Sequence, residues 1–184
     1  GVGTSVFTMI YGRMDTSIVA ATNMASSVEK VLTVFGMGIS SATSIMIGKK
    51  LGEEKPELAY TYSIRSAKIS VGSGIVFGLA FIAMIPLLKA VTNFPPLVDT
   101  YLTQAVLILG ITLAVKTFNF TNIVGILRSG GDTRFTMFLD LGTLWLFGVP
   151  VTFLTGLVFH FPFYLVMICM VLEEWGKMIV GIVR

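Results

Sequence analysis

Gly125-Ile-Leu-Arg-Ser-Gly-Gly-Asp-Thr-Arg-Phe135 is a short polar break between two long apolar runs. The glycine pair Gly130-Gly131 supplies permissive backbone dihedrals for a tight turn and does not favour a continued helix. Two arginines and an aspartate stand beside the pair: Arg128, Asp132 and Arg134. The stretch therefore predicts a water-facing elbow, in which Asp132 caps the following helix by accepting hydrogen bonds from its first amides.

The composition around this elbow is that of a membrane protein. Hydrophobic residues make up 54% of the chain and charged residues 12%, with a mean hydropathy of +0.87. A soluble domain carries about 25% charged residues, and this chain has too few to cover a water-exposed surface. The net charge is +3, and the basic residues lie at the ends of apolar runs rather than on one amphipathic face. This distribution argues against a nucleic acid partner.

A spanning helix needs roughly 20 mostly apolar residues. Six apolar segments are present, and the first, too short to span, is expected to be the end of a longer helix. Their expected ranges are 1–12, 17–48, 57–90, 97–127, 133–159 and 162–184. Pro86 should kink or end the third segment. The second has small residues at every fourth position, which predicts a close-packing stripe: Gly36, Ser40, Ser44, Gly48 and Gly52. The sequence thus predicts an all-α, polytopic bundle of six helices.

The basic residues at segment ends divide unequally between the two sides of such a bundle. By the positive-inside rule the richer side is cytoplasmic, so the elbow and both ends of the segment are expected to face the cytoplasm of a multi-pass plasma membrane protein. The richer side holds Lys49, Lys50, Lys55, Arg65, Lys68, Arg128, Arg134, Lys177 and Arg184. The other side holds only Arg13 and Lys89.

Several charged residues lie inside the apolar runs, where each costs about 2.5–3.5 kcal/mol on insertion scales and usually faces a bundle interior or a watery cavity. They are Glu29, Lys30, Lys116, Asp140, Glu173, Glu174 and Lys177. Glu29, Lys116 and Glu173 each lie roughly 16–18 Å deep, so they can meet at one level. One hypothesis is that Glu29 or Asp140 binds a coupling ion, Na⁺ or H⁺, with Lys116 as a movable counter-charge. Trp145 would then offer its face to an organic cation.

The alternative is that these groups are structural. Glu173 and Lys177, at i and i+4, are neighbours on one helix face and can form an ion pair. Asp140 is shallow enough for an interfacial role, and Asn119 and Asn122 can make interhelical hydrogen bonds. The sole histidine, His160, lies in a turn and the sole cysteine is Cys169, so neither a catalytic constellation nor a metal site nor a cofactor is expected.

Four motifs together resemble the multidrug and toxic compound extrusion (MATE) family. They are Ile18-Val-Ala-Ala21, Ile47-Gly-Lys-Lys-Leu-Gly52, Leu127-Arg-Ser-Gly-Gly-Asp-Thr-Arg134, and Trp145 with Val149-Pro150. The elbow motif is the most specific of them, and the spacing matches the second six-helix lobe of that family over essentially the whole chain. The resemblance implies a twelve-helix antiporter whose lobes are related by a pseudo-twofold axis. Such proteins export organic cations and other drugs against Na⁺ or H⁺ by alternating access.

The expected partners are therefore membrane lipid, a small drug-like or cationic substrate, and an N-terminal lobe that this chain lacks. Some members of the family carry acidic ion ligands on the first and fourth helices of this lobe, but no acid occurs in 1–12 or in 104–127. Thr117 and Asn119 occupy that region instead, so coupling is expected in the missing lobe or on Glu29. Two alternatives stay open: a flippase for lipid-linked sugars, which needs a strongly cationic cavity, and a non-transporting membrane scaffold.

Overall fold

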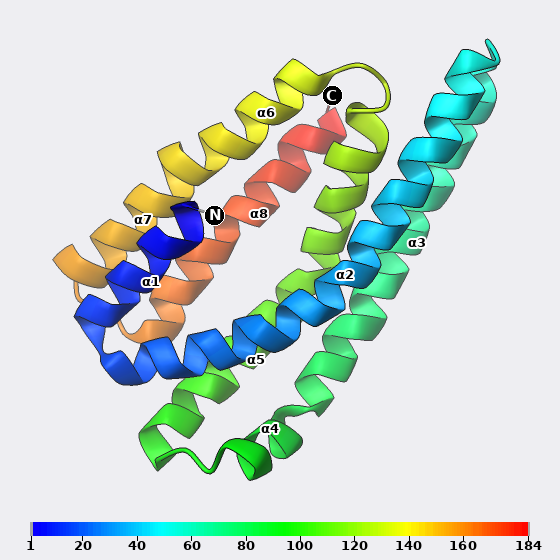
Figure 1. The fold of residues 1–184 in the computed structure, drawn as a ribbon. Coiled ribbons are helices and arrows are strands. Elements are labelled where there is room, and N and C mark those ends of the chain that lie inside the picture. The colour runs from blue at the N-terminus through cyan, green and yellow to red at the C-terminus, as the bar shows by residue number, and fades with distance from the viewer. Residues whose placement is uncertain (1, 184) are drawn as a thin grey trace.

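The computed structural model describes residues 2–183, with side chains from Ser5 onward, and its helices run alongside one another in a bundle (Figure 1). Gly1 of the predicted first segment and Arg184 of the predicted basic set lie outside the described residues. Helical stretches long and apolar enough to cross a membrane are Thr16–Gly52, Pro56–Ala83, Pro96–Leu127 and Thr133–Val158. The predicted all-α membrane bundle is confirmed.

The first and last predicted segments are not among those four. Helix α1, Val2–Met14, has 13 residues and is too short, as expected. Helix α8, Phe163–Val183, has 21 residues but carries Glu173, Glu174 and Lys177. These three charges, rather than its length, set α8 apart from the four apolar stretches.

The predicted second and third segments correspond to α2, Thr16–Gly52, and to two helices in place of one. Asp15 caps the start of α2, where its carboxylate accepts a 2.8 Å hydrogen bond from the Ser17 amide, and the helix continues past the predicted end at 48. The predicted 57–90 helix is broken into α3, Pro56–Ala83, and α4, Ile85–Thr92. Pro86 follows this break, as predicted, because proline has no amide hydrogen with which to continue the helical ladder.

The fourth and fifth segments contain π-helical turns, which the sequence did not predict. Helix α5, Pro96–Asn119, passes into η1, Phe120–Leu127. After the elbow, α6 (Thr133–Gly142), η2 (Thr143–Gly148), α7 (Val149–Phe153) and η3 (Leu154–Val158) form one continuous rod. Such wider turns occur mostly as local bulges within α-helices, frequently at functional sites.

The elbow forms where it was predicted, with Gly131 at φ +95°, a conformation that favours glycine. Asp132 occupies the N-cap position of α6, but its side chain makes no capping hydrogen bond to that helix start. The predicted capping bond is therefore wrong. The reason is the backbone of Asp132, which at φ −86° and ψ 47° is not in the extended region that directs a cap side chain at the first amides.

The rod formed by α5 and η1 is the centre of the bundle, because it packs against α3, α2 and α8. Its approach to α3 is closest at glycines. A Cβ atom on Gly78 would collide with the carbonyl oxygen of Gly110, and one on Gly74 would lie 2.6 Å from the Cα of Ala114. Backbone-to-backbone packing of this kind is what small residues permit between helices in lipid.

Only the first half of the small-residue stripe on α2 packs as predicted. Ser40 is buried and its hydroxyl donates a 2.9 Å hydrogen bond to the Phe120 carbonyl, while a Cβ on Gly36 would lie 3.1 Å from Thr117 Cγ2. Gly48 and Gly52 face open space. At 3.6 residues per turn, each step of four advances about 40° around the helix, so the stripe rotates off the interface.

The two ends of the bundle differ in charge. The elbow and the turn between α2 and α3 lie at one end of the molecule, and α4 and the junction of α1 with α2 lie at the other (Figure 1). At the α2–α3 turn, Lys50 Nζ lies 2.7 Å from Glu53 Oε2, and this hydrogen bond holds the pKa of the Glu53 carboxyl below its usual value. The basic residues of the elbow and of the α2–α3 turn therefore lie at one end, and Arg13 and Lys89 lie at the other.

Candidate functional site

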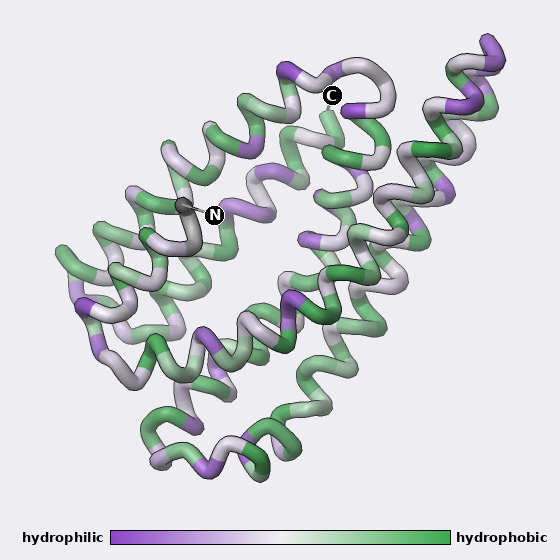
Figure 2. Tube along the Cα trace, viewed as in Figure 1, coloured by the Kyte–Doolittle hydropathy of each residue, from purple (hydrophilic) through white to green (hydrophobic). Residues whose placement is uncertain are grey.

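Hydrophilic stretches interrupt α2, α5 and α8 in the middle of the bundle (Figure 2). On α2 and α5 the residues concerned meet: Lys116 Nζ lies 2.6 Å from Glu29 Oε1. The carboxylate side chain is 9% exposed and the lysine side chain 21%. Lys116 is roughly 16 Å from Leu127 along the rod at 1.5 Å per residue, so this ion pair lies far from either end of its helix.

A second ion pair lies on α8. Lys177 Nζ is 2.6 Å from Glu173 Oε1 and 3.5 Å from Glu174 Oε1. Of the three charges predicted to meet at one depth, Glu29 and Lys116 form an ion pair, whereas Glu173 pairs with Lys177 on its own helix. Because each lysine lies against a carboxylate, neither presents an uncompensated positive charge.

Asn119 links α5 to α8 beside these two pairs. It is the last residue of α5 before the π-helical turn, and it is 4% exposed. Its Nδ2 donates 2.8 Å hydrogen bonds to both the carbonyl oxygen and Oε2 of Glu174. Its Oδ1 is buried and has no hydrogen-bond partner among the described residues. Burying an amide oxygen without a donor is costly, so this atom marks a place where a donor or a cation would be stabilised.

A polar cavity of about 100 Å³ lies beside this asparagine, between the α5–η1 rod, α6 and α8. Its lining includes Lys116, Asn119, Asp140, Glu174 and Lys177. The volume is enough for a few water molecules. Asp140, which comes from α6, also lies 3.5 Å from Arg128 of the elbow, and both of these side chains are about two-fifths exposed. A chain of charged groups therefore leads from the middle of the bundle to the elbow.

The other candidate residues lie outside this cluster or serve the packing. Asn122 is buried and its Nδ2 donates a 2.9 Å hydrogen bond to the Gly181 carbonyl, which is the interhelical bond that the sequence predicts. Lys30 is exposed on α2, and Trp145 is 44% exposed in η2. Neither lines the polar cavity. Among the described residues no group of three or more His, Cys, Asp or Glu side chains is placed to hold a metal ion.

Glu174 is counted above among the charges inside the apolar runs, but the sequence did not indicate it as a residue of this site. It stands next to Glu173 and three residues before Lys177, so it reads as part of the same surface. Adjacent helical residues differ by about 100° in direction, and the packing of α8 on α5 turns Glu174 towards Asn119. The i to i+3 spacing of Glu174 and Lys177 was the one feature of the sequence that could have indicated Glu174.

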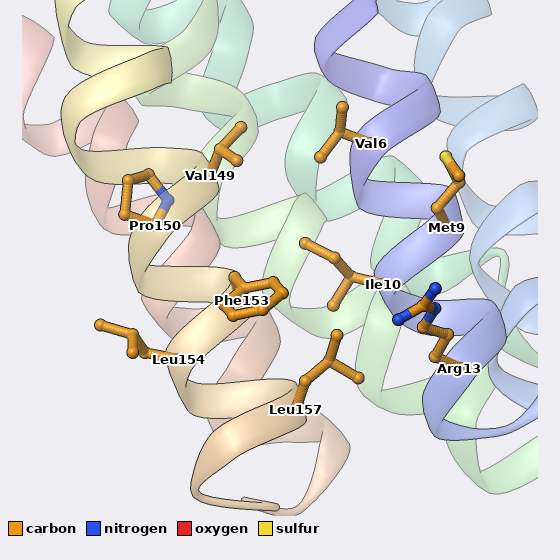
Figure 3. Close-up of a pocket in the computed structure, with 9 residues that line it drawn as sticks. All are labelled: Val6, Met9, Ile10, Arg13, Val149, Pro150, Phe153, Leu154 and Leu157. Carbon is orange, nitrogen blue, oxygen red and sulfur yellow. The ribbon is translucent and has the colours of Figure 1, made fainter.

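A larger and apolar groove, of about 530 Å³, opens between α1 and the α7–η3 part of the rod (Figure 3). Side chains of the two helices face one another across it, and one charged group, Arg13, lies at its edge. They include Val6, Ile10, Val149, Phe153 and Leu157. A volume of 300–1,000 Å³ with apolar walls is typical of small-molecule sites. The groove has no carboxylate in its lining to receive a cation.

Comparison with known proteins identifies the family. Residues 2–154 match the family model described as MatE. The chain belongs to the MatE family. Relatives of this MatE chain include the uncharacterized transporter YisQ of Bacillus subtilis, 26% identical over 79% of the chain, and the multidrug resistance protein NorM of Vibrio vulnificus, 27% identical over 83%. Protein DETOXIFICATION 35 of Arabidopsis thaliana is 22% identical over 94% of the chain.

The MatE chain is much shorter than these relatives. It spans 32–34% of the length of these three proteins. The resemblance noted in the sequence is confirmed at the level of the family. The match shows the family, and it does not by itself show the activity of a full-length transporter.

Proposed function

We propose that the MatE chain is one six-helix lobe of a secondary antiporter that exports drugs or organic cations in exchange for Na⁺ or H⁺. The names of the relatives, multidrug resistance protein and transporter, support this assignment. The second lobe would come from another part of the same polypeptide, and transport would proceed by alternating access between the lobes. The protein would be a multi-pass protein of the plasma membrane, with the elbow and both ends of this segment in the cytoplasm.

The observation that carries the proposal is the ion pair between Glu29 and Lys116. Glu29 is a carboxylate in the middle of a helix, 2.6 Å from a lysine, so a change in its charge alters the electrostatic environment of Lys116. When a proton, a Na⁺ ion or a substrate cation neutralises Glu29, the lysine loses its partner. Lys116 also lines the polar cavity, where Asp140 and Glu174 offer it other carboxylates. Glu29 would thus act as the exchange site and Lys116 as the movable counter-charge.

A lipid-linked sugar flippase is disfavoured by the same geometry. Such a protein needs free positive charge for a pyrophosphate. Lys116 and Lys177, the two lysines at the cavity, each lie 2.6 Å from a carboxylate. A non-transporting scaffold predicts that the ion pair has a structural role only, and the efflux experiment separates it from antiport.

The test is efflux by the full-length protein in proteoliposomes, with Na⁺ and H⁺ gradients imposed separately. Glu29→Gln should reduce gradient-driven efflux of ethidium at least tenfold per protein molecule. Glu57→Gln makes the same chemical change at an exposed position at the start of α3 and should leave efflux unchanged. Wild-type protein that moves no substrate under either gradient would contradict antiport. Undiminished efflux by Glu29→Gln would remove Glu29 from the coupling role.

A further inference from the structure

The apolar groove between α1 and the α7–η3 part of the rod lies at the margin of the bundle (Figure 1). Helix α1 packs against α2, α7 and η3, whereas the central α5–η1 rod packs against α2, α3 and α8. The groove follows α1 from Val6 to Arg13, a length of about 10 Å at 1.5 Å per residue. One leaflet of a bilayer has a hydrocarbon layer of about 15 Å. The groove is therefore long enough to hold much of one lipid acyl chain.

A positive charge stands at one edge of this groove. Arg13 lies in the last turn of α1, is exposed, and borders the apolar walls (Figure 3). The ion pairs among the described residues do not include it. The nearby carboxylate of Asp15 instead accepts a hydrogen bond from the Ser17 amide. A guanidinium is always charged, and its planar fork matches the oxygens of a phosphate. Arg13 is thus complementary in charge to an anionic headgroup.

The lining of the groove distinguishes between possible occupants. An organic cation would find no carboxylate there and would meet the positive charge of Arg13. A neutral apolar molecule would leave Arg13 without a partner. A phospholipid of net negative charge fits both parts, because its chain packs on apolar side chains such as Ile10 and Phe153 while its phosphate accepts hydrogen bonds from the guanidinium.

We propose that this groove binds one anionic phospholipid, with an acyl chain between α1 and the α7–η3 part of the rod and its phosphodiester on Arg13. Lipid tails are as apolar as the walls of the groove, so the chain gains packing but no hydrophobic driving force. Preference for this lipid over its neighbours therefore comes from the charge-assisted bonds of Arg13. The leaflet concerned is the one opposite the elbow, because the junction of α1 with α2 lies at that end (Figure 1). The lipid site does not depend on the proposed antiport.

The experiment locates the lipid by photo-crosslinking to the purified full-length protein. The protein is placed in phosphatidylcholine nanodiscs that contain a little phosphatidylglycerol with a diazirine in one acyl chain. After illumination, mass spectrometry of peptides should find the label on both walls of the groove, in residues 6–13 and 149–157. The same diazirine on phosphatidylcholine should label these peptides more weakly, because the choline ammonium offsets the charge of the phosphate.

Two variants test the two halves of the site, each with a control at the same end of the molecule. Arg13→Gln should lower the labelling of the groove by phosphatidylglycerol about tenfold, the effect of one lost hydrogen bond to a charged group. Lys89→Gln, on α4 and outside the groove, should leave it unchanged. Val6→Phe narrows the groove and should lower the labelling, whereas Val91→Phe, at an exposed position of α4, should not.

Three results would overturn the proposal. The first is equal labelling of the groove by the two lipids, and the second is labelling that Arg13→Gln leaves unchanged. The third is a groove that stays unlabelled in the wild type, which would mean that another part of the full-length protein covers it. If the groove takes up phosphatidylglycerol as expected but no ion gradient drives efflux, the proposed function fails and the lipid site stands.

Discussion

Lys116→Met and Glu29→Gln each remove one member of the central ion pair, and we expect them to lower the stability of the protein by different amounts. At the observed 2.6 Å between Lys116 Nζ and Glu29 Oε1, the gross attraction is about 6 kcal/mol at an effective dielectric constant of about 20. Lys116→Met leaves Glu29, with a side chain 9% exposed, as an unpaired buried charge, which costs about 3–5 kcal/mol. Glu29→Gln leaves a lysine that is 21% exposed and can turn to the carboxylates of the cavity. We expect the smaller loss there, about 1.5–3 kcal/mol.

The assay is unfolding of the full-length protein in detergent micelles, followed by tryptophan fluorescence against denaturant. Lys30→Met, at the exposed lysine next to Glu29, is the control and should change stability by less than about 0.5 kcal/mol. The double variant Glu29→Gln/Lys116→Met should be more stable than Lys116→Met alone, because no unpaired charge remains. Equal losses in the two single variants, or a double variant that shows their sum, would refute the reasoning.

Two further predictions concern glycines. Gly78→Ala would push a methyl group into the Gly110 carbonyl and should destabilise the full-length protein by about 1–3 kcal/mol, measured by the same unfolding assay. Gly72→Ala on the same helix meets nothing within 4 Å and should be neutral or stabilising by up to about 1 kcal/mol; a loss as large as that of Gly78→Ala would contradict the packing. Gly131→Ala, at φ +95°, should cost about 1–2 kcal/mol, and an elbow that accepts alanine without loss would argue against this turn geometry.

Much of the fold follows from local conformational preferences that can be recognised in the sequence. The elbow was located from Gly130, Gly131 and the charges beside them, and the break before α4 from Pro86. Both features arise within a few residues of the chain. Proline lacks an amide hydrogen and glycine tolerates positive φ wherever they occur, so no knowledge of the packing was needed.

Features that depend on the angular position of a side chain around its helix were predicted less well. The stripe from Gly36 to Gly52 was expected to pack along its length, but the helix turns Gly48 and Gly52 away from α5 and η1. The capping bond of Asp132 fails for a related reason, because it depends on the φ and ψ of one residue in a tight turn. Small deviations in rotation accumulate along a helix and do not show in spacing alone.

The amino-acid sequence alone is enough to predict that the chain is a membrane bundle, where its turns fall, and which charges lie inside its helices. Apolar length, proline, glycine and lysine are local properties, and so is the i to i+4 spacing of Glu173 and Lys177. The packing of the helices sets the contact of Lys116 with Glu29, 87 positions away, and that of Asn119 with Glu174, 55 positions away. Pairing between distant helices depends on their rotation and depth, which are fixed by the joint packing of all the helices and by no single stretch of sequence.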